Sequence, residues 1–274
     1  MKKTVFVLLD ACQYESATRN LGYLEHMIDA GSAAKYKVKG ELPSLSRPMY
    51  ATLMTGLPAS SHGILCNEIV KTLTCDSLFS LCQAQGGVTA AAAYHWMSEL
   101  YNVSPFAVPR DRIRHGQGGH IDHGIFYWED MYPDSHVFSD GEYLRKTYDA
   151  DFTLIHSMSI DYMGHQHGCD SSEYEWAVSN AGCLISRFVP GWLEDGCNVV
   201  VTADHGMNRF GIHGGTDAIQ RNTPLYIFSD KVKNGRFTDR EISQLWVAPL
   251  VARLMEIEPS KAMLDPKQIP IAFV

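Results

Sequence analysis

The sequence predicts an α/β fold with a central, mostly parallel sheet and helices on both faces, for three reasons. Short apolar runs alternate with helical patterns along the chain, which is typical of an open α/β sheet. The apolar runs are continuous, as expected for strands that helices cover on both sides. Polar residues such as Asp10 and His205 follow these runs. Because ligands bind open sheets at the carboxyl ends of the strands, those residues are the first candidates for a functional site.

The elements are predicted in chain order from these patterns. Strands are expected at TVFVLLDA, which reaches Asp10, at VTAAAAYHW (Val88 to Trp96), at FTLIHSMSID, which ends at Asp161, at NVVVTADHG, which carries Asp204 and His205, and at TPLYIFSD (Thr223 to Asp230). Helices are expected at CDSLFSLCQAQGG, where Gly86 and Gly87 end the pattern, at SSEYEWAVSNAGCLISRFV and at ISQLWVAPLVARLMEI.

One segment breaks this alternation. From about residue 97 to 150 the chain is rich in Gly, His, Asp and aromatic residues and shows no clear periodicity. We expect an irregular, cap-like insertion there, which lies over the sheet edge and faces the substrate. The rest of the 274 residues, with 45% hydrophobic content, is expected to form a single domain with a substantial core.

Composition argues against two classes of partner. The formal net charge is −8, and the only dense cationic run, PRDRIRH from Pro109, also contains an acid, so no nucleic-acid polymer is expected to bind. The N-terminal apolar run is only about six residues long, too short for a signal peptide or a membrane span. The seven cysteines form no CxxC pair. Reduced thiols and a cytoplasmic protein without membrane contact are therefore predicted.

Six residues at predicted strand ends and loops are candidate metal ligands. Asp161 and His165 lie four residues apart, a pattern that is weak alone, since a strand-end cap and a surface histidine produce it equally well. Asp204 and His205 follow a strongly apolar strand, where charges need partners. Taken together, three carboxylates and three imidazoles meet at one edge, enough oxygen and nitrogen ligands for two ions such as zinc: Asp10, Asp161, His165, Asp204, His205 and His213.

Ser46 is the candidate nucleophile. Metal ions about 4 Å apart favour in-line displacement at phosphorus, a reaction that requires an attacking oxygen. Ser46 precedes Pro48 at the start of a predicted helix, where the dipole and free amides favour an anion. The simpler interpretation is that Ser46 caps the helix.

With these residues identified, the chain resembles the alkaline phosphatase superfamily, and most closely its type I phosphodiesterase/nucleotide pyrophosphatase branch. The resemblance extends over nearly the whole chain and rests on LLDA, PSLSRPMYATLMTGLPASSHGILCN, DYMGHQHG, VTADHGM, HGG and VAPLVARLMEIEPSKAM. It implies an alkaline phosphatase-like fold. It also implies that one ion is held by Asp10, Ser46, Asp204 and His205, and the other by Asp161, His165 and His213. Zinc is the preferred metal, with manganese or iron as alternatives.

The resemblance also implies roles in catalysis. Ser46 matches the family nucleophile, which in this branch is commonly threonine, and Asn67 matches an asparagine that binds a phosphoryl oxygen. The expected activity is metal-dependent hydrolysis of phosphate esters, preferably phosphodiesters or nucleotide pyrophosphates, through a covalent intermediate on Ser46. The substrate is then a small-molecule phosphate ester.

Three alternatives to this activity are considered. A phosphonate hydrolase of the phosphonoacetate hydrolase type uses the same metal site, and YHWMSE and RHGQGGHIDHGIFYW could supply its recognition residues. A sulfatase is the weaker alternative, because Tyr50 stands where that branch has an arginine. A binding protein with structural metals is disfavoured, since all seven expected metal-site positions are filled.

Overall fold

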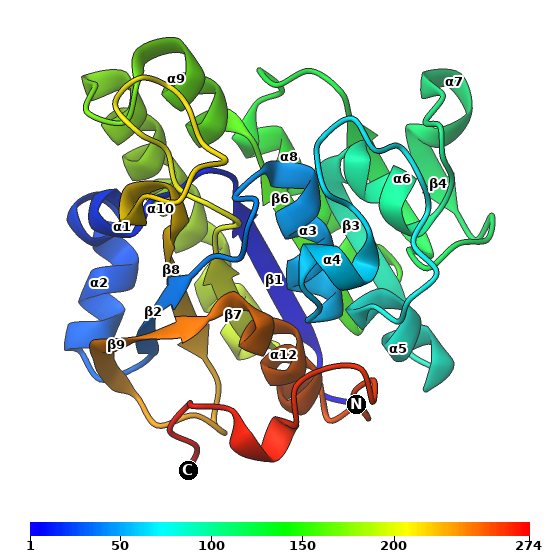
Figure 1. Ribbon diagram of the computed structural model, residues 1–274. Helices are drawn as coiled ribbons and strands as arrows, with labels where there is room; N and C mark the ends of the chain where they lie inside the picture. Colours follow the sequence, from blue (N-terminus) through cyan, green and yellow to red (C-terminus); the bar gives the residue numbers. More distant parts are fainter.

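A nine-stranded sheet runs through the computed structural model, which describes all residues from Met1 to Val274 (Figure 1). The strand order is β4-β5-β3-β6-β1-β7-β8-β2-β9. Their bounds are β1 Thr4–Leu9, β2 Ala34–Lys39, β3 Thr89–Tyr94, β4 Ile113–His115, β5 His123–Tyr127, β6 Phe152–Ser157, β7 Asn198–Thr202, β8 Asn222–Phe228 and β9 Gly235–Ser243.

The central part of the sheet is parallel. Strands β5, β3, β6, β1 and β7 all run in the same direction, whereas β8 is antiparallel to both of its neighbours, β7 and β2. Because β8 is antiparallel to β7 and β2 is antiparallel to β8, β2 runs in the same direction as β7 and β1. The carboxyl ends of β1, β2, β6 and β7 therefore lie at one edge of the sheet, the upper edge in Figure 1.

Helices cover both faces, as predicted. Along β1, Val5 and Val7 pack into one apolar core and Phe6 and Leu8 into the other, because successive side chains point to opposite faces. Figure 1 shows α3 and α12 in front of the sheet and α10 behind it. One face is covered by α1 (Tyr14–Asn20), α2 (Gly22–Asp29), α8 (Asp134–Thr147), α9 (Ser159–His167) and α10 (Ser172–Glu194), and the other by α3 (Ser46–Thr55), α5 (Leu78–Ala84), α6 (Trp96–Tyr101) and α12 (Val247–Met255).

The remaining elements are single turns. They are α4 (Ala59–His62), α7 (Val108–Asp111), α11 (Ala218–Arg221) and the 3₁₀ turns η1 (Gln244–Trp246) and η2 (Pro266–Gln268). No helix in the structure combines the length and the apolar character that a membrane span requires.

The expected irregular insertion at 97–150 is wrong in part. Strand β5 adds to the sheet beside β3, and β4 forms its outer edge. Helix α8 packs on the same sheet through Val137, Phe138 and Leu144. Irregular backbone is confined to the connections between these elements, so the segment mainly extends the sheet rather than forming a cap over it.

Two strands and one boundary also differ from the prediction. The sequence analysis did not identify β2 or β9, and the strand expected to reach Asp161 ends at Ser157. Asp161 lies instead in the first turn of α9, which starts at Ser159.

Candidate active site

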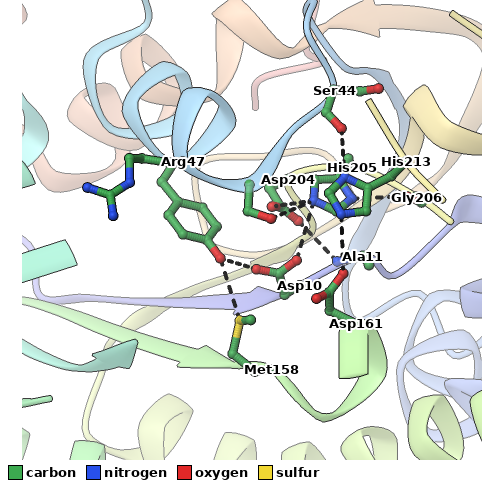
Figure 2. A network of polar contacts seen from close by, with 12 residues as sticks. Asp10, Ala11, Ser44, Arg47, Met158, Asp161, Asp204, His205, Gly206 and His213 are labelled. Atoms are coloured by element: carbon green, nitrogen blue, oxygen red, sulfur yellow. Dashed lines mark hydrogen bonds and ion pairs between the residues drawn. The ribbon is translucent and has the colours of Figure 1, made fainter. Parts of the chain in front are cut away.

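The upper edge of the sheet brings the six candidate ligands together. Asp10 directly follows β1, and Asp204 and His205 follow β7. Asp161 and His165 lie one turn apart on α9, so both side chains project from the same helix face. The loop after β7 then returns His213 to the site. The close-up in Figure 2 shows Asp10, Asp161, Asp204, His205 and His213 converging.

One cluster consists of Asp10, Asp204 and His205, all fully buried. Their ligand atoms lie within 4.8 Å of one another. The Nε2 atom of His205 is 3.5 Å from Asp10 Oδ1 and 3.2 Å from Asp204 Oδ2. Three donors at this spacing, with one imidazole nitrogen facing two carboxylates, could hold a divalent cation.

A second cluster shares His205 with the first. Asp161, His205 and His213 also have ligand atoms within 4.8 Å of one another, and the rings of His205 and His213 stack 3.9 Å apart. His165 adjoins this cluster, because its Nε2 lies 3.4 Å from Asp161 Oδ2 and 3.2 Å from His213 Nε2. His205 thus stands between the two sets of donors.

The backbone fixes the three imidazoles in one orientation. Each Nδ1 faces a carbonyl oxygen: that of Gly211 for His165 (2.8 Å), of Gly206 for His205 (2.9 Å) and of Ser44 for His213 (3.1 Å). A carbonyl only accepts, so each Nδ1 carries the proton and each Nε2 presents a lone pair to the site. Metal-binding histidines are held in this way.

The hydrogen bonding of the three carboxylates indicates whether metal ions fit the site. Asp10 Oδ1, Asp161 Oδ1 and Asp204 Oδ2 are buried and have no hydrogen-bond partner in the protein. Buried, unpaired carboxylate oxygens are costly, and a coordinated cation removes that cost. Burial and the charge of Asp10 raise the pKa values of Asp161 and Asp204 well above their usual range. The donor set therefore fits divalent cations, zinc among them.

Asp10 behaves differently from the other two carboxylates. Although burial raises its pKa, a hydrogen bond from His156 and the proximity of His205 outweigh that effect and lower the pKa to about 2. Conversely, burial and the neighbouring His213 lower the pKa of His205 to about 3, so its ring is neutral, as a metal ligand must be.

Ser46 is the first residue of α3 and lies beside these donors. Its buried Oγ is 3.1 Å from His205 Nε2. Ser46 does not cap the helix, because the N-cap position is occupied by Leu45. The apolar side chain of Leu45 forms no capping hydrogen bond. The capping bond comes from Asn67 instead, whose Oδ1 accepts a hydrogen bond of 3.0 Å from the Arg47 amide.

This bond orients Asn67. The amide of Arg47 can only donate, so the oxygen of the Asn67 side chain faces the helix and its NH₂ group points elsewhere. In the first turn of α3, Pro48 has no amide hydrogen and the Arg47 amide is bonded to Asn67. The Ser46 amide donates no hydrogen bond within the protein and is therefore the free donor of this turn. The site of Ser46 is therefore suited to an anion.

Arg47 points away from the candidate ligands (Figure 2). Its guanidinium lies 4.4 Å from the ring centre of Trp96, and Nη1 is 2.8 Å from Glu99 Oε2. Both partners belong to YHWMSE, the stretch considered above for phosphonate recognition. The side chains of Trp96 and Glu99 are used instead to hold Arg47 and, through it, the start of α3.

Two further residues of the site, Tyr50 and His156, could not be assigned to it from the sequence. The hydroxyl of Tyr50 donates to Asp10 Oδ2, and His156 Nε2 lies 3.2 Å from the same oxygen. Both side chains are fully buried. The only signal for His156 was a histidine within the otherwise apolar run FTLIHS, and nothing in the sequence linked it to Tyr50.

Comparisons with known proteins identify the family and the fold. The family model for type I phosphodiesterase / nucleotide pyrophosphatase matches residues 4–222. Among curated proteins, GPI ethanolamine phosphate transferase 3, catalytic subunit, of Mus musculus is 28% identical over 122 residues, covering 37% of this chain and 11% of that protein. The corresponding transferase 2 subunit of Homo sapiens is 21% identical over 244 residues, covering 83% of this chain and 23% of that protein. The chain thus spans less than a quarter of either relative.

Solved structures show the same fold. Murine ectonucleotide pyrophosphatase / phosphodiesterase 5 superposes with a TM-score of 0.74 at 11% identity, covering 95% of this chain and 96% of that chain. An inactive variant of the same murine protein in complex with AMP gives a TM-score of 0.78 at 11% identity, covering 99% and 100%. At this identity the likeness establishes the fold alone. The match of the family model across most of the chain goes further: the protein belongs to the type I phosphodiesterase / nucleotide pyrophosphatase family, within the alkaline phosphatase superfamily.

Proposed function

We propose that the protein is a two-metal hydrolase of phosphate esters, primarily phosphodiesters or nucleotide pyrophosphates, with Ser46 as its nucleophile. One observation carries the proposal: Ser46 Oγ lies 3.1 Å from His205 Nε2, and His205 belongs to both clusters of candidate ligands. A hydroxyl in this position is available to the same cations as the carboxylates around it.

The ligand assignment is the one that the family resemblance implies, and it divides the residues of the two clusters between two ions, with His205 on the first ion and His165 added to the second. Asp10, Ser46, Asp204 and His205 would hold one ion, and Asp161, His165 and His213 the other. Imidazole and carboxylate ligands suit zinc, manganese and iron, and zinc is preferred because the family resemblance implies it. When bound, the ions would lower the pKa of the Ser46 hydroxyl, neutralise charge on the phosphoryl group and activate water.

The chain's own groups then support a double displacement. The Ser46 hydroxyl loses its proton to solvent and its Oγ attacks phosphorus, so that a new Oγ–P bond forms. The bond from phosphorus to the leaving oxygen breaks with its electron pair on that oxygen, which takes a proton from solvent and leaves the phosphoryl group on Ser46. The free NH₂ group of Asn67 and the amide at the start of α3 donate to the phosphoryl oxygens as negative charge develops. Attack by water on the opposite face releases product and regenerates Ser46, with net retention at phosphorus.

The class of ester is inferred from relatives. The murine structural neighbour was solved with AMP, and the curated relatives are named ethanolamine phosphate transferases, so both nucleotide and amino-alcohol esters belong in a substrate panel. Phosphonates and sulfate esters complete the panel. Trp96 and Glu99 are engaged with Arg47 and are not available to recognise a phosphonate, so activity on phosphonates would have to rely on other residues. The cytoplasmic location and the absence of nucleic-acid polymer or membrane partners stay predictions.

The proposal is tested by comparing Ser46→Ala with wild type on the whole panel. Loss of the nucleophile should lower the rate on the best substrate by at least about 10³-fold. Ser61→Ala, which changes an exposed serine on neighbouring α4, serves as the matched control and should retain wild-type rates. Retention of at least a tenth of the wild-type rate by Ser46→Ala would show that another group attacks phosphorus.

Metal dependence is tested on the same proteins. Elemental analysis should find about two transition-metal ions per chain, and protein stripped with a chelator should lose activity and recover it when zinc or manganese is added. A wild-type protein that binds no metal and hydrolyses no member of the panel would contradict the proposal.

A further inference from the structure

Asp10 receives hydrogen bonds on only one of its two oxygens. Tyr50 and His156 both contact Oδ2, whereas Oδ1 is buried without a partner and faces His205 Nε2 at 3.5 Å. A carboxylate accepts but does not donate, so the proton in each contact belongs to the tyrosine hydroxyl or to the imidazole Nε2. The two oxygens of Asp10 are therefore chemically distinct before any cation binds.

Packing holds both donors in place. Tyr50 and His156 are fully buried, and their rings meet edge to face with centres 4.7 Å apart. The hydroxyl of Tyr127 donates to the carbonyl of His156 (2.7 Å), and Tyr50 also lies against Trp96, 6.2 Å between ring centres. Neither donor can turn away from Asp10 without displacing neighbouring core side chains.

Tyr50 also connects Asp10 to the nucleophile. It lies one helical turn after Ser46 on α3, so the two side chains project from the same face of the helix. The hydrogen bond from Tyr50 thus sets the distance between the helix that carries Ser46 and the end of β1 that carries Asp10.

We infer that Tyr50 and His156 are positioning residues, which hold Oδ2 of Asp10 so that only Oδ1 is available to a metal ion. The inference rests on the proposed two-metal function. It assigns to this chain a tyrosine–histidine pair that orients a ligand without itself touching metal or substrate. Groups that orient ligands in this way typically change metal affinity by about 10- to 100-fold when removed.

The direct test is zinc binding to metal-stripped protein, measured by competition with a chromophoric chelator. Tyr50→Phe removes one hydroxyl and retains the ring, so we expect two zinc ions per chain with one of them bound about 10- to 100-fold more weakly. Tyr226→Phe is the matched control. It also removes a buried tyrosine hydroxyl that donates to a carboxylate, Glu25 Oε1 at 2.5 Å, but one outside the site. Its zinc affinities should equal those of wild type.

The histidine arm tests the same inference independently. His156→Leu, which lacks a donor, should weaken the same ion as Tyr50→Phe, whereas His156→Gln, whose amide can still donate to Oδ2, should recover most of the affinity. The visible absorption of bound Co²⁺ provides a second readout, because band intensity falls when Asp10 adds a second oxygen to the coordination sphere. If one variant fails to fold, as judged by circular dichroism, the other decides.

Two results would overturn the inference, and they have different consequences for the proposed function. Wild-type protein that binds two zinc ions, with Tyr50→Phe and His156→Leu both within threefold of it at each ion, would remove the positioning role and leave the proposed function intact. Wild-type protein that binds neither zinc nor manganese and hydrolyses no member of the substrate panel would overturn both.

Discussion

Replacing Glu99 with glutamine should measurably destabilise the protein, because it leaves the Arg47 guanidinium buried without its counter-ion. Arg47 Nη1 and Glu99 Oε2 are 2.8 Å apart, and the two side chains are only 2% and 6% exposed. Glutamine preserves the shape of the side chain, and its one oxygen can keep the bond from the Phe106 amide, which Glu99 Oε1 now accepts at 3.0 Å. Its NH₂ group then replaces Oε2 opposite Arg47. The substitution therefore removes the counter-ion of Arg47 without creating a cavity.

The magnitude follows from the geometry. At 2.8 Å the attraction is about 6 kcal/mol for an effective dielectric constant of about 20, although desolvation offsets much of this. Breaking a buried pair typically costs about 3–5 kcal/mol. We expect the lower end, about 3 kcal/mol, because Trp96 still stacks on the guanidinium. With an unfolding entropy of about 2.1 cal/mol/K per residue over 274 residues, this loss corresponds to a fall in Tm of about 5 °C.

The assay is thermal and urea unfolding of wild type, Glu99→Gln, Arg47→Met and the double variant. The double variant removes both charges and should be more stable than the sum of the single losses predicts. Glu175→Gln is the matched control, since Glu175 Oε1 and Arg19 Nη2 form a pair of similar length, 3.0 Å, that is exposed. Its cost should stay below about 1 kcal/mol. A fall of less than 2 °C for Glu99→Gln, or strict additivity in the double variant, would refute the reasoning.

Two further predictions concern pH and substrate binding. Burial, together with the charge of Lys71, lowers the pKa of His62 from 6.5 to about 4. The unfolded chain therefore binds more protons between these values, so the stability due to His62 is present above pH 6.5 and is lost as the pH falls to about 4. The shift corresponds to about 3 kcal/mol, which partial solvation reduces to roughly 2 kcal/mol. Urea midpoints over this range should fall less steeply in His62→Gln, and parallel slopes would contradict the assignment. Asn67→Ala should lower kcat/KM by about 10²- to 10³-fold with unchanged metal content, whereas a loss below tenfold would exclude its role as a phosphoryl donor.

The parts of the fold that could be predicted were those whose sequence signal is local. Strands β1, β6 and β7 are continuous apolar runs, and parallel strands bring their carboxyl ends to one edge, so Asp10 and Asp204 could be grouped from the sequence. Strand β2 could not be recognised. Its sequence, AKYKVK, alternates apolar and polar residues as a half-buried strand does, but three lysines in six residues suggest an exposed loop. Lys35 is nevertheless fully buried and paired with Glu25 Oε1 at 2.5 Å, a contact that the sequence does not reveal.

Helix α8 was missed for a different reason. Val137, Phe138 and Leu144 recur at helical spacing, but Gly141 interrupts the pattern and favours a loop. In the structure this glycine is where the helix approaches the sheet, since a Cβ atom there would lie 2.5 Å from Ile155 Cγ1. A residue that weakens the helix signal is thus the one that allows the helix to pack.

The sequence of α3 also gives no signal for how the helix packs, and for this reason the residues around Ser46 could not be assigned roles. All ten residues of this helix are buried, so no apolar stripe distinguishes one face from another. Nevertheless, side chains among its first five residues point in two different directions and contact different parts of the protein. Ser46 and Tyr50, one turn apart, face the candidate ligands, whereas Arg47, about 100° around the helix, faces Trp96 and Glu99. Because both directions are fixed by charge-bearing contacts to different segments, the helix cannot rotate to relax either one. The position of the Ser46 oxygen is therefore set by contacts on both sides of α3, and a serine can be held there without the additional methyl group that threonine would provide.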